Sequence, residues 1–214
     1  MKVVVLGATG ATGQLVVEQA LERGLSVVAY VRNASGLAPR PGLEVIQGQL
    51  NDVGLLSQAT TGADAVLVTL GPKETKHVDL MQKSLPLIMQ AMKAAKVVRI
   101  MLMSAYGVGD TARTASLVAR LAYKTMVASV YEDKARSEAA LPTSGLQWTS
   151  VLPVILTNGP VSDEIGVWVM SRVVKVSGLP KVSRANVAKA MLDAIRDVRA
   201  INQQLLVAPR AAVR

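Results

Sequence analysis

The sequence predicts an α/β protein with a single domain, in which a doubly wound parallel sheet carries helices on both faces. Three observations predict it. Apolar, β-branched runs alternate with helical patterns along most of the chain, as they do in β-α-β units. Half of the 214 residues are hydrophobic, which is enough for one substantial core. No linker, internal repeat or low-complexity tract divides the chain, so one domain over residues 1–214 is the simplest account.

The first strand and the first helix enclose a glycine-rich turn. Residues 3–6 form an apolar run that is typical of a buried strand. Gly7, Gly10 and Gly13 follow at a regular spacing, and residues 14–21 contain no helix breaker. A strand, a glycine turn and a helix in this order form the layout that binds the pyrophosphate of a dinucleotide.

Each glycine of this turn has its own expected role. Gly7 permits the tight turn, Gly10 lets the backbone approach a pyrophosphate, and Gly13 lets the helix pack close to the strand. The start of the helix offers N–H groups and the positive end of its dipole to the anion. The hydroxyls of Thr9 and Thr12 add donors. Such turns also occur where no nucleotide binds, but their placement between a first strand and a first helix favours a dinucleotide.

The rest of the chain continues the alternation of strands and helices. Further strands are expected at residues 26–32, 43–47, 63–70, 97–103, 147–152 and 204–207. Further helices are expected at residues 52–59, 78–96, 124–141 and 186–198. Pro86 lies inside the second of these helices and is expected to kink it. Segments 105–123 and 154–183 are less regular, and we expect them to form most of the substrate pocket, because segments that follow strands carry binding sites in this architecture.

The composition excludes several kinds of site. The chain has no cysteine, so it has no disulfide, no thiolate nucleophile and no cysteine zinc site. His77 is the one histidine, and we expect it to be an exposed residue and not part of a metal site, so no metal is predicted. No run approaches about 18 apolar residues, and the N-terminus starts a strand instead of a signal peptide. We therefore expect a cytoplasmic protein with no membrane partner.

The net charge of +9 is compatible with nucleic acid, a membrane surface or an anionic small molecule. The basic residues are spread along the chain without a Lys/Arg run. Phenylalanine is absent, and four tyrosines and two tryptophans leave little for stacking on bases. A polyanionic cofactor or substrate is the better explanation for part of the charge, and no nucleic-acid partner is expected.

Arg32, at the end of the second expected strand, indicates which cofactor is bound. An acidic residue there would accept hydrogen bonds from the adenosine ribose and select NAD. An arginine favours the 2′-phosphate of NADP instead. No acidic residue follows until Glu44. The expected cofactor is therefore NADP(H), and the alternative is an ordinary exposed arginine at a strand end.

Several motifs together resemble the atypical short-chain dehydrogenase/reductase group, of the NmrA-like, NAD(P)H-binding type. They are GATGATG at 7–13, YVRN at 30–33, GQLND at 48–52 and VSRANVA at 182–188. The resemblance covers most of the chain and implies a Rossmann fold. The compact length, AVLVTLG at 65–71 and MKAAKVVRIMLMSAYG at 92–107 are most similar to the flavin reductase / biliverdin reductase B branch.

The resemblance implies a series of cofactor-binding positions at strand ends. The glycine turn would hold the diphosphate, and Arg32 would meet the 2′-phosphate. The family's Gly-Asp-Leu motif reads Gly-Gln-Leu here, so Gln49 would meet the adenine through an amide instead of a carboxylate. Ser104 would face the nicotinamide, and Pro153 would begin the loop beside that ring. The full expected set is Gly7, Thr9, Gly10, Ala11, Thr12, Gly13, Arg32, Gln49, Leu50, Leu70, Gly71, Ser104 and Pro153.

The expected catalytic residues are Ser104, Tyr106 and Lys134, although the chain departs from the classical pattern. Classical members use Tyr-x-x-x-Lys, in which the lysine lowers the pKa of the tyrosine that donates the proton. Neither Tyr123 nor Tyr131 has a lysine at the fourth position. Ser104 could bind the nicotinamide amide or a substrate carbonyl. Tyr106 could donate a proton, stack on a flat ring or simply pack its loop.

Lys134 lies in DKARSEAAL, which resembles the Asp-Lys-x-x-x-Glu helix of the family. A lysine there touches the cofactor ribose or acts as a base in related groups, and the alternative is an exposed surface lysine. The family branch has Pro-Pro-His after the sixth strand, whereas this chain has Pro153, Val154 and Ile155. Because this histidine is missing, the resemblance supports the tetrapyrrole substrate of that branch less strongly for this chain. Trp168 and Met170 could line a flat aromatic site or cover the core.

Two functions follow from these residues. The first is NADPH-dependent reduction of a planar conjugated acceptor, such as a flavin, a quinone or a tetrapyrrole, by hydride transfer. The cofactor performs that chemistry, so water can deliver the proton. The alternative is a non-catalytic NADP(H)-binding redox sensor or regulator of the NmrA-like type. The absent Tyr-x-x-x-Lys pair is compatible with both and disfavours an epimerase or a dehydratase.

Overall fold

The computed structural model describes residues 1–34, 36–72 and 74–214. Its strands are β1 Lys2–Leu6, β2 Ser26–Val31, β3 Leu43–Gln47, β4 Ala65–Val68, β5 Arg99–Met103, β6 Gln147–Pro153, β7 Ile155–Thr157, β8 Ile165–Val169, β9 Lys181–Ser183 and β10 Gln203–Pro209. Its α-helices are α1 Ala11–Glu22, α2 Val53–Thr60, α3 Leu80–Ala94, α4 Leu117–Met126, α5 Ala128–Glu138 and α6 Arg184–Asp193.

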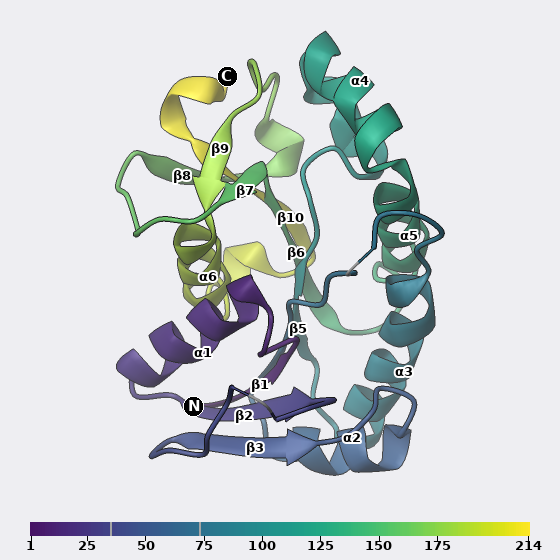
Figure 1. Ribbon diagram of the computed structural model, residues 1–214, viewed down its shortest axis with the longest axis vertical. Coiled ribbons are helices and arrows are strands. Elements are labelled where there is room, and N and C mark those ends of the chain that lie inside the picture. The colour runs from purple at the N-terminus through teal and green to yellow at the C-terminus, as the bar shows by residue number, and fades with distance from the viewer. Residues whose placement is uncertain (35, 73) are drawn as a thin grey trace.

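Eight of the strands form one sheet in the order β3-β2-β1-β4-β5-β6-β10-β8 (Figure 1). All neighbours in it are parallel except β8, which runs antiparallel to β10. The chain builds outward from β1 to β3 and then crosses back to β4 on the other side of β1. This reversal makes the sheet doubly wound, as predicted, and it opens a crevice at the carboxyl ends of β1 and β4.

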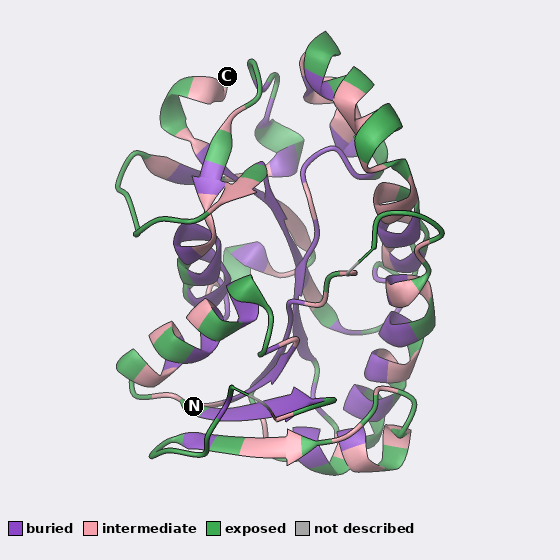
Figure 2. Cartoon of the chain, in the orientation of Figure 1, coloured by how far each residue is buried: buried purple, intermediate pink, exposed green. Residues whose placement is uncertain are grey.

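The alternation of side chains along β1 explains why the sheet needs helices on both faces. Val3 and Val5 belong to the apolar cluster that contains α1 and α6, whereas Val4 and Leu6 belong to the cluster that contains α2 and α3. All four side chains are fully buried, because successive residues of a strand point to opposite faces. Figure 2 shows the buried strands as the central layer between the two layers of helices.

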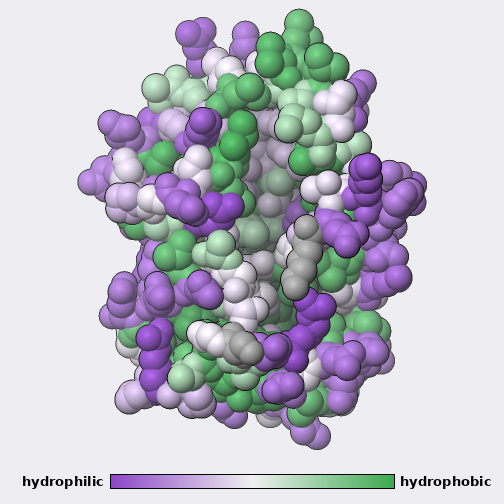
Figure 3. Space-filling view, viewed as in Figure 1, coloured by the Kyte–Doolittle hydropathy of each residue, from purple (hydrophilic) through white to green (hydrophobic). Residues whose placement is uncertain are grey.

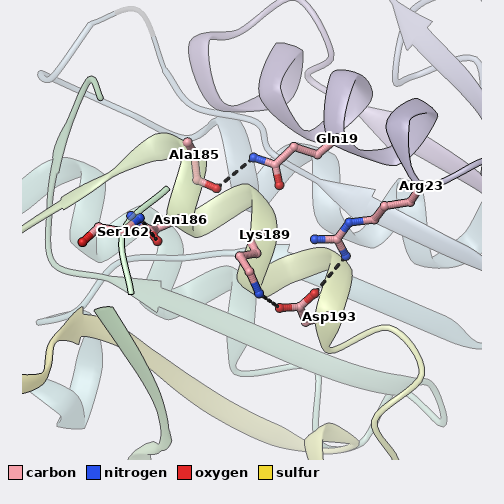
Figure 4. A network of polar contacts seen from close by, with 7 residues as sticks. All are labelled: Gln19, Arg23, Ser162, Ala185, Asn186, Lys189 and Asp193. Carbon is pink, nitrogen blue, oxygen red and sulfur yellow. Dashed lines mark hydrogen bonds and ion pairs between the residues drawn. The ribbon is translucent and has the colours of Figure 1, made fainter. Parts of the chain in front are cut away.

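Polar contacts join α1 and α6, the two helices that cover the same face of the sheet (Figure 4). The amide of Gln19 donates to the carbonyl oxygen of Ala185 at 3.0 Å. The carboxylate of Asp193 accepts from Arg23 at 2.9 Å and from Lys189 at 2.6 Å. Only the Arg23–Asp193 pair crosses between the two segments, because Lys189 and Asp193 belong to the same helix. Both ion pairs are half-exposed, so each adds little to stability.

The helix expected at 124–141 is wrong in its extent, because the structure has two helices there. α4 begins at Leu117, inside a segment that was expected to be irregular, and α5 begins after Val127. Val127 leaves the helical region with φ −132° and ψ 17°. The hydroxyl of Ser116 accepts from the N–H of Ala119 at 3.2 Å and so caps α4. The sequence pattern missed the start of α4 because most of its apolar side chains face outward.

Other differences lie at the ends of elements and near the C-terminus. The last strand was expected to be short and extends over seven residues as β10, inside the sheet between β6 and β8. The irregular segment 154–183 contributes β8 to the main sheet, and β7 and β9 pair with each other. α3 runs as one helix through Pro86, whose side chain is exposed. α6 ends at Asp193, five residues earlier than expected.

Candidate functional site

The glycine turn follows β1 at the carboxyl edge of the sheet. Gly7 has a positive φ of 87°, and a Cβ there would come within 2.9 Å of the backbone carbonyl group of Thr69. A Cβ on Gly13 would overlap the carbonyl oxygen of Gly7. Gly10 differs from both, because its φ of −78° suits any residue and its Cβ would meet only the carbonyl oxygen of Gly7, at 3.2 Å. The fold itself therefore requires Gly7 and Gly13, whereas Gly10 keeps space open outside the turn.

The first turn of α1 faces open space at this point. Gly10 is its N-cap, and no side chain in the described chain caps the helix there. Thr9, Gly10 and Ala11 are exposed, whereas Thr12 is buried. Helix-start N–H groups without a side-chain cap, together with the helix dipole, form an anion-binding site.

A hollow of about 270 Å³ adjoins the turn. It is lined by Gly7, Thr9, Gly10, Tyr30, Val31, Arg32, Gly48, Leu50, Thr69, Leu70, Gly71 and Leu80. A second hollow of about 280 Å³ shares Arg32, Gly71 and Leu80 with the first and adds Lys76 and His77. Of the positions expected to bind the cofactor, the first hollow brings together Gly7, Thr9, Gly10, Arg32, Leu50, Leu70 and Gly71.

Tyr30 fixes the chain on the β3 side of the hollow. Its buried hydroxyl donates to the carbonyl oxygen of Gln49 at 2.8 Å. A Cβ on Gly48 would overlap this hydroxyl, so the glycine of the Gly-Gln-Leu motif is required by Tyr30. Burial, followed by the charge of Asp52, raises the pKa of Tyr30 and keeps the hydroxyl neutral. Sequence reasoning did not identify Tyr30 as a site residue, and the side chain of Gln49 is exposed and lies outside the lining of the hollow.

A buried polar cluster lies at the ends of β5 and β6. The hydroxyl of Ser104, the residue after β5, donates to the carboxylate of Glu138 at 2.5 Å. The hydroxyl of Ser150, on β6, donates to the second oxygen of that carboxylate at 3.3 Å. The ammonium of Lys134 donates to the carbonyl oxygen of Met103 at 2.9 Å. Lys134 is 6% exposed, which excludes the surface-lysine alternative.

Burial perturbs both charged groups of this cluster. It raises the pKa of Glu138, and the charge of Lys134 and the two serine hydroxyls act against that rise. It lowers the pKa of Lys134, and the charges of Glu138 and Asp133 act against that fall. Sequence reasoning named Ser104 and Lys134 but not Glu138. The Asp-Lys-x-x-x-Glu spacing contained the signal, because its glutamate lies one helical turn after the lysine on the same face.

Asp133, the first residue of that motif, has a structural role. Its carboxylate accepts from the N–H groups of Met81 and Gln82 at the start of α3, both at 2.9 Å. A carboxylate from α5 therefore caps α3, which explains how α3 and α5 are held side by side. One helical segment supplies both this cap and the buried cluster around Glu138.

Tyr106 lies in a group of three tyrosines beside the buried cluster. Its hydroxyl shares a hydrogen bond of 2.8 Å with that of Thr114, and its ring meets Tyr123 edge-on at 6.4 Å. Tyr131 donates to the carbonyl oxygen of Tyr106 at 3.1 Å. Burial raises the pKa of all three hydroxyls, that of Tyr131 to about 12. Tyr106 and Ser104 are both buried, and neither lines the hollow next to the glycine turn. The pairing of the Tyr106 hydroxyl with Thr114 is what supports its packing role more directly than proton donation.

Not all of the remaining residues that the sequence singled out lie near the glycine turn. Pro153 ends β6, and its carbonyl oxygen accepts from the N–H of Tyr106 at 2.9 Å. Trp168 borders a hollow of about 660 Å³ that also contains Gln203, the first residue of β10, so it lies at the opposite end of the sheet from the glycine turn. Met170 is buried in the core. His77 is exposed, as expected.

The irregular segments that were expected to form the substrate pocket do lie side by side. Ala115 and Val176 form a parallel bridge, and the hydroxyl of Ser116 donates to the carbonyl oxygen of Gly178 at 2.8 Å. Across the described residues, no helix combines the length and the apolar character needed to cross a membrane.

Comparisons with known proteins place these features in a family context. A family model for NAD(P)H-binding proteins matches residues 7–198. A short-chain dehydrogenase/reductase from Veillonella parvula DSM 2008, solved with NADP, has a TM-score of 0.82 at 19% identity and covers 100% of this chain and 96% of its own. A candidate NADH-flavin reductase from Streptococcus pneumoniae TIGR4 has a TM-score of 0.81 at 22% identity and covers 98% and 100%. The anaerobilin reductase ChuY from Escherichia coli O157:H7 has a TM-score of 0.78 at 22% identity and covers 98% of each chain.

Proposed function

Because this chain belongs to the NAD(P)H-binding family, we propose that it binds NADP(H) along the glycine turn and passes a hydride from NADPH to a planar conjugated acceptor. Flavins, quinones and tetrapyrroles are the acceptor classes. One observation carries the cofactor part of this proposal. The hollow of about 270 Å³ connects the exposed start of α1 to Arg32 and is lined by most of the residues that a dinucleotide would need.

Each part of the hollow suits one part of the cofactor. The N–H groups at the start of α1 and the hydroxyl of Thr9 would hold the pyrophosphate. Leu50 and Leu70 offer apolar surface against which flat rings can pack. The cofactor supplies the hydride, and the protein supplies position and a dry surrounding.

Arg32 supports a preference for NADP(H) over NAD(H). It borders both hollows, and Lys76 and His77 line the second hollow beside it. Glu74 and Asp79 line that hollow as well, so Arg32 lies in a mixed and not a purely basic surrounding. Since an arginine at the end of β2 pairs with a 2′-phosphate, we expect NADP(H) to bind at least about tenfold more tightly.

The buried cluster suits orientation of the nicotinamide ring more than proton transfer. When the hydroxyl of Ser104 donates to Glu138, its lone pairs stay available to accept from the nicotinamide amide. Glu138 acts through Ser104, so it is a positioning residue. With the hydroxyl of Tyr106 paired to Thr114, the rate would come mainly from holding the ring against a flat acceptor, and water would supply the proton.

Two structural neighbours, a candidate NADH-flavin reductase and an anaerobilin reductase, share this fold, and that likeness supports the proposed class of acceptor. The same buried Tyr106 favours a second candidate function, an NADP(H)-binding redox sensor without turnover. The sensor would use the same hollow and the same cofactor.

Two measurements test the proposal. Calorimetric titration with NADPH and NADH measures cofactor binding, and the loss of NADPH absorbance with FMN, menadione and biliverdin measures turnover. Binding of NADPH with turnover of at least one acceptor is the expected result. Tight binding without turnover of any acceptor would favour the sensor, and a chain that binds neither cofactor would contradict both functions.

A further inference from the structure

α4 presents an apolar face to solvent. Leu117, Val118 and Leu121 are 79%, 64% and 66% exposed and lie on the side of the helix away from Ala119, the one residue of the helix that is buried. Met126, 73% exposed, ends the helix seven positions after Ala119 and does not belong to this face. Val174, 79% exposed, extends this face, because the bridge between Ala115 and Val176 places its segment beside the start of α4. Figure 3 shows hydrophobic atoms gathered at the upper right, where α4 projects from the molecule.

The same helix carries positive charge and no negative charge. Arg120 and Lys124 are exposed and lie one turn apart. At that spacing they form a row along the helix, next to the row formed by Leu117 and Leu121. No aspartate or glutamate occurs between Asp110 and Glu132. The outward side of α4 is therefore apolar with a basic margin.

The charge of this face decides between its possible occupants. A second copy packed on it would bring Arg120 and Lys124 of both molecules into one contact, in a chain whose net charge is already +9. Like charges in one contact oppose association. A bilayer that contains anionic lipids complements both the apolar side chains and the positive charges of this face. Its acyl boundary accepts leucine and valine, and its headgroups attract arginine and lysine.

We propose that α4 docks this protein on the surface of a membrane that contains anionic lipid. Leu117, Val118 and Leu121 enter the boundary between headgroups and acyl chains, and Arg120 and Lys124 contact the headgroup phosphates. No spanning helix is needed for this contact. The sequence predicted no membrane partner, because the chain has neither a spanning segment nor a Lys/Arg run. A ten-residue helix with an outward apolar face shows neither of these signals.

The position of α4 gives this docking a consequence for the proposed reductase. Tyr123, on the inward side of α4, packs against Tyr106, two residues after Ser104, so the docking helix lies beside the loop that follows Ser104. If the proposed reduction is correct, a lipophilic acceptor dissolved in the membrane reaches the site from this side. Membrane binding itself does not depend on that reduction, and the two are measured separately.

Flotation of the full chain with lipid vesicles tests the docking. We expect the protein to float with vesicles of phosphatidylcholine and phosphatidylglycerol, to float poorly with phosphatidylcholine alone, and to be released by high salt. The double variant Leu117→Ser/Leu121→Ser and the double variant Arg120→Glu/Lys124→Glu should each lower the bound fraction at least tenfold. All four side chains are exposed, so the thermal unfolding midpoint should change little.

Matched controls lie at the other end of the molecule. Val198→Ser changes a residue that is 76% exposed, near the start of β10. Lys93→Glu/Lys96→Glu changes the net charge as much as the α4 charge variant does, with Lys93 in the last turn of α3 and Lys96 just after the helix. Both controls should bind vesicles as the unaltered protein does. Equal losses in the controls, or no vesicle binding by the unaltered protein, would overturn the proposal. A dimer that Leu117→Ser/Leu121→Ser dissociates, without vesicle binding, would identify a second copy as the occupant.

Discussion

The glycine turn at residues 7–13 and the cluster around Glu138 lie at the same carboxyl edge of the sheet, but they are built differently. The turn is made of backbone from one continuous stretch, shaped by the places where a Cβ does not fit. The cluster is made of side chains from β6, α5 and the residue after β5, and its outermost members, Ser104 and Ser150, are more than forty positions apart. Backbone sites are specified by local sequence and tolerate almost no change at their glycines, whereas side-chain clusters are specified by the fold and tolerate isosteric replacement.

The largest expected effect separates two glycines of the turn. Gly13→Val should prevent stable folding, because its Cβ would overlap the carbonyl oxygen of Gly7. Gly10→Val should fold, since its φ suits valine and the nearest atom is 3.2 Å from the new Cβ. We expect Gly10→Val to lose NADPH affinity by about 100-fold or more, ~2.8 kcal/mol. Circular dichroism and calorimetric titration measure the two effects. Normal NADPH binding by Gly10→Val would place the cofactor elsewhere.

A smaller effect should change cofactor choice without removing binding. Arg32→Asp should reverse the preference between NADP(H) and NAD(H), because the carboxylate repels a 2′-phosphate and accepts hydrogen bonds from a free ribose. We expect a change of about tenfold in the affinity for each cofactor, ~1.4 kcal/mol. Arg40→Asp, an exposed arginine in the same connection between β2 and β3, is the matched control. Equal affinities of the unaltered protein for the two cofactors would contradict the role of Arg32.

The turn and the cluster also differ in how much of them the sequence could predict. Gly7, Gly10 and Gly13 lie in one short stretch, and their spacing reflects packing within that stretch, so the turn and its hollow were predictable. Arg32 and Leu70 follow strands, and the parallel order of β2, β1 and β4 brings them to the same edge. These positions needed only the correct topology.

The cluster required contacts that no local pattern contains. Glu138 meets Ser104 because the fold brings α5 to the end of β5, and Asp133 of the same helix caps α3. For Tyr106 the sequence left proton donation, stacking and packing open, and the pairing of its hydroxyl with Thr114 is a contact that no local pattern contains. α4 was missed for a related reason. Its apolar side chains face outward, so the pattern that normally identifies a helix packed on a core was absent.

We expect the cluster around Glu138 to make the stability of the protein depend on pH. Burial holds the pKa of Glu138 above its ordinary value in the folded protein. The folded state therefore keeps a proton that the unfolded chain releases, so the contribution of this group is full below the unfolded pKa of about 4.3 and declines as the pH rises through the folded pKa. Glu138→Gln removes the titration and keeps an acceptor for Ser104. We expect its stability relative to the unaltered protein to increase as the pH rises above the unfolded pKa of about 4.3 and to level off above the folded pKa.

Two further variants sharpen that measurement. Glu138→Leu leaves the hydroxyls of Ser104 and Ser150 without their acceptor and should cost about 1–3 kcal/mol. Glu132→Gln, on the exposed side of the same helix, should change the urea midpoint little at any pH. A pH dependence that is the same in Glu138→Gln and in the unaltered protein would show that another group carries it.

The smallest expected effects distinguish the hydroxyl of Ser104, which we propose orients the nicotinamide, from the hydroxyl of Tyr106, which packs the loop. Ser104→Ala removes one orienting hydrogen bond and should lower kcat about tenfold, ~1.4 kcal/mol, with little change in NADPH affinity. Tyr106→Phe removes the bond to Thr114 and should lower stability by about 1 kcal/mol while leaving kcat nearly unchanged. Lys134→Ala should act mainly on cofactor affinity, because the family resemblance implies that this lysine touches the cofactor ribose; it also removes the donor to the carbonyl oxygen of Met103. Steady-state kinetics with NADPH and the best acceptor, together with urea unfolding, measure all three. A thousandfold loss of kcat in Tyr106→Phe or Lys134→Ala would identify a general acid, and the orientation mechanism would then be wrong.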